Sequence, residues 1–366
     1  MLNESEKNNS APLLLTSTPS FSEKDSELRT PNPELFCDDS ELRTPNPELS
    51  CAVVVASFRP GRLIDRCLRA LLAQQGIANL DVVVVDSSAD GTAERLRQDF
   101  PAVEVIKLEQ QTPQSIARNL GVARTQAQFV AITDHDCVVP PDWLTRLLAR
   151  HREGEYAAVG GAVGNGTPDS MVGTASYLIE FNEFMPVGEP HLVAMVPHCN
   201  VCFRREVFTT VGPFVEVPPG AEDLVFNFLL CQQGGRILFD PTIIVEHINR
   251  TVFSVFLRHQ HLLGVGSAIA RRTAALKGQT LLRHPTLAYG LPLLRLIRTA
   301  GRLLKSNRLA LLRYVGLLPI LLPGYTAWTA GFLAGLRQTL PVAQPGQTET
   351  LARWKSQAGT ASEEMR

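Results

Sequence analysis

Four short apolar runs, each followed by polar residues, alternate with stretches of helical spacing between residues 51 and 134. The runs cover residues 51–56, 81–86, 103–108 and 129–132, and the helical stretches cover 62–75, 115–124 and a segment that starts at Ala93. Short runs without apolar–polar alternation are typical of strands that are buried on both faces. Such alternation predicts an α/β fold, in which helices cover a mainly parallel sheet and ligands bind at the carboxyl ends of the strands.

Polar side chains gather where these runs end. Ser57 and Arg59 follow the first run, Asp86 closes the second, and Asp134 and Asp136 follow the fourth. Because the carboxyl ends of parallel strands meet at one edge of a sheet, we expect a binding site there.

Asp134 and Asp136 stand two residues apart. If the strand stays extended, both carboxylates point to one side and His135 points to the other. Paired carboxylates suit Mg²⁺ or Mn²⁺ that carries a diphosphate. The alternative is that the pair only caps the next turn and helix, since Pro140, Pro141 and Asp142 are typical of a helix start.

No GxGxxG follows the first run, so a dinucleotide-binding Rossmann domain is not indicated, and SFRPG at 57–61 is a phosphate loop only loosely. The order of motifs instead resembles a family 2 glycosyltransferase with the GT-A fold, from about Ala52 to His247. Six segments carry the resemblance: VVVASFRPGRLIDRCLRALLAQ, VVVVDSSADGT, IARNLGVART, FVAITDHDCVVPPDW, CNVCFRREVF and GAEDLVFNFLLCQQGGRILFDP.

The resemblance implies a donor site around the first strands. In such enzymes Ser57 and Arg59 lie against the nucleotide, Asp86 accepts a hydrogen bond from the base, and Arg118 and Asn119 line the donor pocket. The residues alone allow other roles. Arg59 and Arg118 would also fit solvated charges, and Asp86 would fit a cap on the turn that follows it.

The resemblance also implies a divalent cation. Asp134 would face the ribose or the metal, Asp136 would be the direct ligand, and His247 would be a further ligand. Imidazole is a more usual ligand of Mn²⁺ than of Mg²⁺, so Mn²⁺ is plausible beside Mg²⁺. A single histidine after a strand is otherwise more often structural.

Glu222 and Asp223 open a predicted helix, 224–230. Acids in a first helical turn are common because of the helix dipole alone. By resemblance Asp223 is the general base that activates the acceptor hydroxyl for a single inverting displacement, and Glu222 contacts substrate. The residues after this pair, LVFNFLL, are mostly apolar where the family usually has polar ones, so the resemblance does not indicate the chemical nature of the acceptor. The absence of QxxRW favours a single transfer over polymerisation.

The C-terminal part predicts contact with a membrane. Twelve Lys or Arg and no Asp or Glu lie between Arg250 and Arg313. Arg295, Arg298 and Arg302 share one helical face, as in a helix at the lipid interface on the cytoplasmic side. Residues 314–336 lack charge over 23 residues, enough to cross a hydrocarbon layer of about 30 Å. A re-entrant segment or a buried helical hairpin is the alternative.

The predicted organisation has five parts. They are a disordered extension with a repeated DSELRTPNPEL (1–50), the GT-A domain (51–250), a helical continuation near the acceptor site (251–285), an interfacial helix with a transmembrane or re-entrant segment (286–340), and a polar tail (341–366). The seven cysteines are an odd number and include no second CxxC beside Cys199 and Cys202, which indicates a reducing compartment. Zinc at Cys199 and Cys202 is a lesser alternative to two buried thiols.

These patterns predict a membrane-associated, metal-dependent inverting glycosyltransferase on the cytoplasmic face of the membrane. Its donor would be a nucleotide sugar, with UDP-sugars among the candidates, and its acceptor a lipid-linked or cell-surface glycan, as in cell envelope polysaccharide biosynthesis. We expect no nucleic-acid partner. The alternatives are a sugar-phosphate nucleotidyltransferase and a catalytically inactive membrane adaptor.

Overall fold

The structure is a computed structural model that describes residues 50–216, 220–306 and 308–338, and no side chains between 305 and 310. All of these residues belong to one compact unit, Asp39–Arg366. The repeat-containing extension before residue 50 and the polar tail from 341 lie outside the described residues.

The described residues contain a sheet of nine strands in the order β3-β2-β1-β4-β8-β6-β9-β5, with β7 paired to β9. Strands β3, β2, β1 and β4 are parallel, β8 is antiparallel to both of its neighbours, and β6 is parallel to β9. The bounds are β1 Ser50–Ser57, β2 Asn79–Asp86, β3 Glu104–Lys107, β4 Phe129–Asp134, β5 Cys137–Val138, β6 Ala158–Asn165, β7 His191–Val193, β8 Val201–Arg204 and β9 Ile237–His247. The parallel half confirms the sequence prediction, and the second half is mixed.

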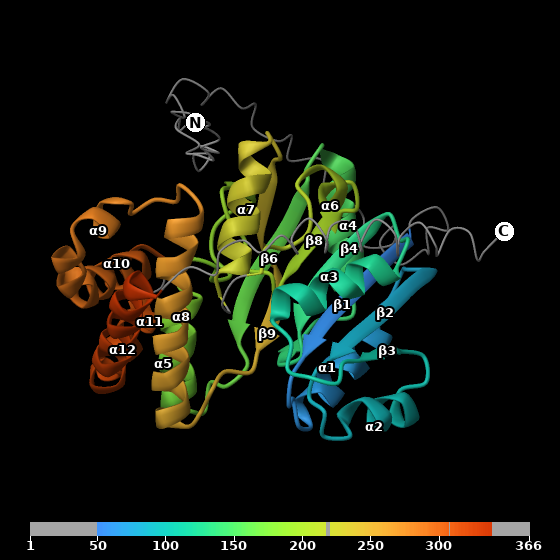
Figure 1. Cartoon of the computed structure of the whole chain (residues 1–366), viewed down its shortest axis with the longest axis horizontal. Helices are drawn as coiled ribbons and strands as arrows, with labels where there is room; N and C mark the ends of the chain where they lie inside the picture. Colours follow the sequence, from blue (N-terminus) through green and yellow to red (C-terminus); the bar gives the residue numbers. More distant parts are fainter. Residues whose placement is uncertain (1–49, 217–219, 307, 339–366) are drawn as a thin grey trace, which may run out of the picture. The chain divides into compact units, whose positions relative to one another are not determined.

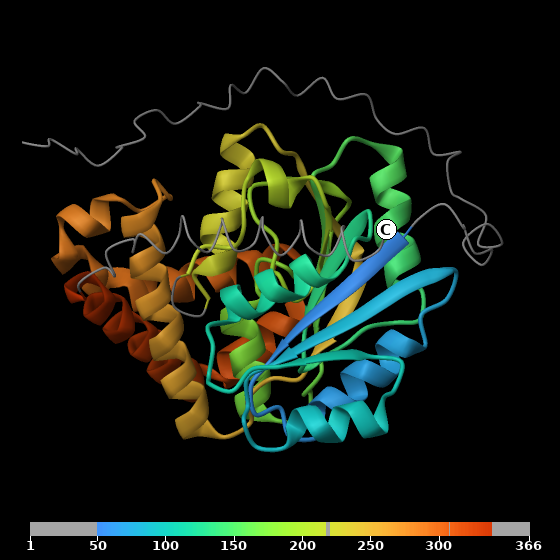
Figure 2. The same ribbon diagram turned by 45° about the vertical axis from the view of Figure 1, so that its right-hand side comes forward.

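The helices follow the predicted alternation in the first half, and α8 to α12 lie together on one side of the molecule (Figure 1). Their bounds are α1 Leu63–Leu72, α2 Thr92–Asp99, α3 Gln114–Arg124, α4 Trp143–Glu153, α5 Met171–Glu180, α6 Val207–Thr210, α7 Glu222–Gln232, α8 Phe253–Thr273, α9 Thr280–Arg283, α10 Leu291–Ser306, α11 Arg308–Gly316 and α12 Leu318–Arg337, with a 3₁₀ helix at Pro285–Gly290. Figure 2 shows α1 and α2 beneath the parallel strands. The apolar residues of β1 and β4 are fully buried, which explains why their sequences lack alternation.

Helices α8 and α12 pack with their backbones in close contact. A Cβ atom on Gly264 would lie 2.0 Å from the carbonyl oxygen of Trp328, and one on Gly331 would lie 1.9 Å from the carbonyl oxygen of His261. Only glycine leaves room for such an approach. The apolar side of α12, including Leu321, Tyr325 and Phe332, is therefore buried within the protein.

The prediction of one membrane-crossing helix over 314–336 is wrong. The apolar run divides between α11 and α12, with a break at Leu317. Within the described ranges, no helix combines the length and the apolar character that crossing a bilayer requires. The physical reason is that the apolar residues serve helix–helix packing, as in the buried hairpin alternative, and the hydroxyl groups of Tyr314 and Tyr325 lie 3.1 Å apart in that interface.

Helix α10 is amphipathic, but its arginines do not form a free basic face. Arg295 lies over the Trp328 ring, and Arg302 pairs with Glu183 and donates to Asn182. The apolar side of the helix is exposed instead, with Leu293 62% and Ile297 59% accessible. The interfacial helix is thus present as an element, while two of its three arginines contact the protein.

We expect Gly331→Ala to lower the free energy of unfolding by about 1–3 kcal/mol, since the added methyl group must push α12 away from α8. Gly301→Ala is the matched control, because its Cβ would meet nothing within 4 Å on the exposed side of α10. That change should stabilise the helix by about 0.5–1 kcal/mol. Urea unfolding of both variants measures the difference, and equal stabilities would contradict this packing.

Candidate active site

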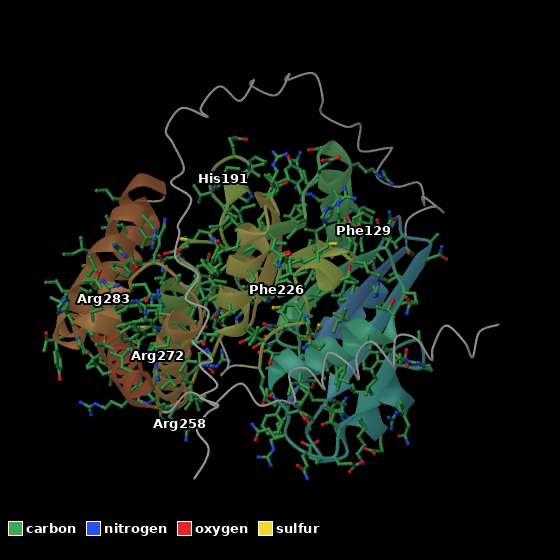
Figure 3. All side chains as sticks on the ribbon, turned by 45° about the horizontal axis from the view of Figure 1, so that its top comes forward. Phe129, His191, Phe226, Arg258, Arg272 and Arg283 are labelled. Carbon is green, nitrogen blue, oxygen red and sulfur yellow. The ribbon has the colours of Figure 1, made fainter. Side chains whose placement is uncertain are left out.

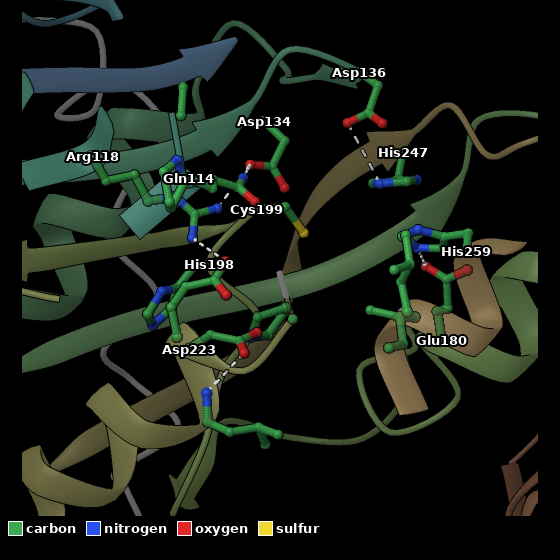
Figure 4. A pocket seen from close by; sticks show the side chains of 18 of the residues that line it. Gln114, Arg118, Asp134, Asp136, Glu180, His198, Cys199, Asp223, His247 and His259 are labelled. Atoms are coloured by element: carbon green, nitrogen blue, oxygen red, sulfur yellow. Dashed lines mark hydrogen bonds and ion pairs between the residues drawn. The ribbon is translucent and has the colours of Figure 1, made fainter. Parts of the chain in front are cut away.

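A cavity of about 900 Å³ opens where β1 and β4 end, and it extends to α5, α8, α10 and α12. Most of the predicted site residues line it, although they come from distant parts of the sequence (Figure 4). These are Ser57, Arg118, Asp134, Asp136, Glu222, Asp223 and His247. His135 also lines the cavity because β4 ends at Asp134, so the extended geometry that would turn His135 away does not continue.

Three predicted donor-site residues do not line this cavity. The Asp86 carboxylate accepts a hydrogen bond from the Ser88 hydroxyl (2.6 Å), which in turn accepts one from the backbone N–H of Arg59 (2.7 Å). The Asn119 amide exchanges two hydrogen bonds, both of 2.9 Å, with the backbone of Phe214. Asp86 at the end of β2 and Asn119 on α3 therefore hold neighbouring loops in place. The donor contacts of Arg59, Asp86 and Asn119 stay predictions.

A buried guanidinium joins the acids at the cavity wall. Arg118 is 2% exposed, and it donates to Asp134 Oδ1 (2.9 Å) and Glu222 Oε1 (3.2 Å). Gln114, one helical turn earlier in α3, also donates to Asp134 (2.8 Å). Burial would lower the pKa of Arg118, but Asp134 and Glu222 outweigh burial and raise it. Arg118 lines the cavity, its guanidinium is bound to two carboxylates, and its contact with a donor stays a prediction.

Glu222 and Asp223 stand at the start of α7. Burial raises the pKa of Glu222 to about 7, against the attraction of Arg118. Burial likewise raises the pKa of Asp223, although Arg118 and the backbone N–H of Leu224 (2.7 Å) both favour its charged form. A carboxylate with a raised pKa is a stronger base. Its raised pKa and its position in the cavity wall thus suit Asp223 for accepting a proton.

Backbone pairing brings His247 to Asp136. Strand β5 is antiparallel to β9 and places Cys137 opposite His247, and the N–H of Ile248 donates to the carbonyl of Asp136 (2.8 Å). As a result, His247 Nε2 lies 3.6 Å from Asp136 Oδ1. Two residues that the sequence offered as metal ligands are adjacent in space.

Asn249 orients the His247 ring. Its amide nitrogen donates to Asn165, Thr167 and the carbonyl of His247, so its oxygen faces His247 Nδ1 at 3.0 Å. An amide oxygen only accepts, so Nδ1 carries the proton in the neutral ring and Nε2 presents its lone pair toward Asp136. Sequence reasoning missed Asn249, although its position two residues after the histidine was a possible signal.

These donors fit a divalent cation. The ligand atoms of Asp136, Cys137 and His247 all lie within 4.8 Å of one another. Burial raises the pKa of the Cys137 thiol, and Mg²⁺ and Mn²⁺ prefer oxygen and nitrogen ligands to sulfur, which favours Asp136 and His247 as the donors. Mn²⁺ and Mg²⁺ both accept carboxylate oxygen, and the imidazole favours Mn²⁺. Cys199 and Cys202 are buried thiols that do not belong to this group.

Sequence analysis did not identify the groups at the helical end of the cavity. The Glu180 carboxylate of α5 accepts from Gln260 (2.8 Å) and lies 3.3 Å from His259 Nε2, both on α8 (Figure 4). Burial would raise the pKa of Glu180, but the charge and hydrogen bond of His259 lower it to about 2. Arg295 and Trp328 complete this end. The basic sequence RHQHLLG at residues 258–264, which contains His259 and Gln260, was the available signal.

The chain is similar to known glycosyltransferases. Residues 52–212 match Glycosyl transferase family 2. The succinoglycan biosynthesis protein ExoO of Rhizobium meliloti is 28% identical over 240 residues, which cover 60% of this chain and 68% of that protein. The succinoglycan biosynthesis protein ExoM of the same organism is 30% identical over 200 residues, which cover 51% of this chain and 63% of that protein.

Among solved structures, a mannosyltransferase from Pyrobaculum calidifontis, in complex with GDP-Man and Mn²⁺, aligns with 87% of this chain and 88% of its own. The TM-score is 0.49 and the sequence identity is 18%. The family match covers the strand ends that carry Ser57 and Asp134, and it favours sugar transfer over the nucleotidyltransferase and inactive adaptor alternatives. Over residues 52–212 the chain therefore belongs to glycosyl transferase family 2.

Proposed function

We propose that this chain is a metal-dependent inverting glycosyltransferase that uses Asp223 as general base. The observation that carries the proposal is the meeting of two groups of residues in one cavity. Asp136 and His247 form a cation site, and Asp223 stands apart from them at the start of α7.

Asp136 and His247 would hold Mn²⁺ or Mg²⁺, which supplies positive charge to the departing nucleoside diphosphate. The Ser57 hydroxyl is buried at the cavity wall without a hydrogen-bond partner among the described residues, so a polar ligand can satisfy it. Asp223 would take the proton of the acceptor hydroxyl as that oxygen attacks the anomeric carbon. Arg118 would keep Asp134 and Glu222 in place beside the reacting groups.

The acceptor in this proposal is a lipid-linked or cell-surface glycan precursor, in polysaccharide biosynthesis. Two relatives, ExoO and ExoM, carry the name of succinoglycan biosynthesis proteins. Which nucleotide and sugar the donor carries does not follow from these residues.

We also propose that the enzyme works at the cytoplasmic face of a membrane, docked through the exposed apolar side of α10 and α11. Leu293, Ile297 and Leu304 follow helical spacing on α10, and Leu312 of α11 is 70% exposed. Exposed Arg298 lies at the edge of this side, and residues 250–338 contain no acid to repel anionic headgroups. Figure 3 shows Arg258, Arg272 and Arg283 on this helical part of the molecule. Apolar side chains beside basic ones are typical of a helix that lies in the lipid interface.

Membrane docking predicts that Leu293→Ser with Ile297→Ser weakens binding to vesicles with anionic lipid by about tenfold or more, because two exposed apolar side chains lose their burial in lipid. Vesicle sedimentation measures this. Leu192→Ser, an exposed residue on β7, is the control and should bind as wild type does. Equal binding by the double variant would rule out this docking side.

For the chemistry, Asp223→Asn should leave nucleotide binding unchanged and slow transfer by roughly 10²–10⁴-fold, since only the proton acceptor is lost. The assay follows labelled sugar from the nucleotide donor into a membrane fraction, with nucleotide affinity measured in parallel. Asp169→Asn removes an exposed carboxylate outside the cavity and should behave as wild type. Near-normal turnover by the Asp223 variant would remove this residue as base.

A further inference from the structure

Arg295 on α10 lines the helical end of the cavity and has an unusual set of contacts. Its guanidinium lies 4.0 Å from the centre of the Trp328 ring and 5.5 Å from that of Tyr325. No described residue accepts a hydrogen bond from it or forms an ion pair with it. Burial lowers the pKa of Arg295 to about 10, so the group is still charged at neutral pH.

The Arg295 side chain is partly buried, and a guanidinium held in such a place can bind an anionic ligand through its N–H groups. The nearby acids are already engaged. Glu180 interacts with His259 and Gln260, and Glu183 pairs with Arg302. Stacking occupies the face of the Arg295 guanidinium and leaves its N–H groups available for a ligand.

A second cation lines the same cavity. Arg250 follows β9, three residues after His247, and has no hydrogen bond or ion pair with any described side chain. The side-chain oxygen of Gln260 is also buried there without a donor. Neither arginine forms a hydrogen bond or ion pair with a described carboxylate, although the charge of Arg250 lowers the pKa of Asp136 and of Glu180. With one acceptor that lacks a donor, they describe a site for a ligand that carries both an anionic group and hydroxyl groups.

Arg295 and Trp328 lie on other elements than the residues of the proposed cation site. Arg295 and Trp328 come from helices of the C-terminal part, while Asp134 and Asp136 come from the end of β4. The cavity also has apolar side chains at the helical end, Leu262 and Leu263. The docking side proposed above lies on the same helix as Arg295, so a ligand that enters from a lipid surface would meet this end.

We infer that the helical end of the cavity, with Arg295 and Arg250, is a subsite for a phosphate group on the acceptor, so that the acceptor belongs to the class of phosphate-bearing molecules. This inference rests on the proposed function, because it assigns the acceptor to a cavity whose other part takes the nucleotide. The phosphate can belong to a lipid phosphate or to a soluble sugar phosphate.

Calorimetry on the full chain tests the subsite directly. Octyl phosphate and inorganic phosphate serve as probes, with Mn²⁺, UDP and GDP all present so that the donor site is filled. Arg295→Met should weaken binding of octyl phosphate by about tenfold or more, since a charge-assisted hydrogen bond is lost while contact with Trp328 is kept. Arg295→Lys should bind with intermediate affinity, and Arg66→Met, at an exposed position of α1 outside the cavity, should bind as wild type does.

Tighter binding of octyl phosphate than of inorganic phosphate would identify a lipid source, and equal binding would identify a soluble one. Wild-type affinity in a folded Arg295→Met variant, or no binding of either probe by wild type, would overturn the inference. If Arg295→Met fails to fold, Arg250→Gln replaces it, with the same loss expected. The proposed function can fail separately. If the probes bind in a way that depends on Arg295 but neither UDP nor GDP shows Mn²⁺-dependent binding, the proposed function is wrong and the phosphate subsite still stands.

Discussion

One short antiparallel pairing, β5 with β9, decides where the cation site can form. Its register places Cys137 opposite His247 and brings the imidazole to within 3.6 Å of Asp136. Asn249 then fixes the ring so that one nitrogen faces the carboxylate. The rest of the cavity is arranged around this point, since β4 delivers Asp134 and Asp136 from one side and β9 delivers His247 from the other.

A second constraint is the buried charge of Arg118. Its guanidinium connects Asp134 at the end of β4 with Glu222 at the start of α7, so the sheet and the helix hold one another through a polar network. Removing one partner from such a network leaves a charge buried and unpaired, which is far more costly than losing an exposed ion pair. The same network sets the electrostatic surroundings of Asp223, whose raised pKa suits a base.

Much of the first half of the fold could be predicted from the sequence. The apolar runs that form β1, β2 and β4 are short and do not alternate with polar residues, and such runs are typical of strands buried on both faces. Asp134 was found because it stands where a strand ends, whereas Asp223 was found through the family resemblance, since an acid in a first helical turn is common on its own. That Asp136 and His247 lie together followed only from the family resemblance, since β5 has two residues and no local sequence pattern indicates which strand it pairs with. Arg295 was read as a lipid-facing charge because helical spacing cannot reveal Trp328, and the apolar run of α12 was read as a membrane span because sequence does not show the glycine contacts with α8.

The central claim is that Asp136 and His247 hold a divalent cation that binds the nucleotide. Calorimetry of UDP and GDP binding to the full chain, with and without Mn²⁺, tests it most directly when wild type is compared with Asp136→Asn. The account predicts that at least one nucleotide binds in a Mn²⁺-dependent manner and that the substitution abolishes this dependence. The same Mn²⁺-dependent affinity in wild type and variant would contradict it.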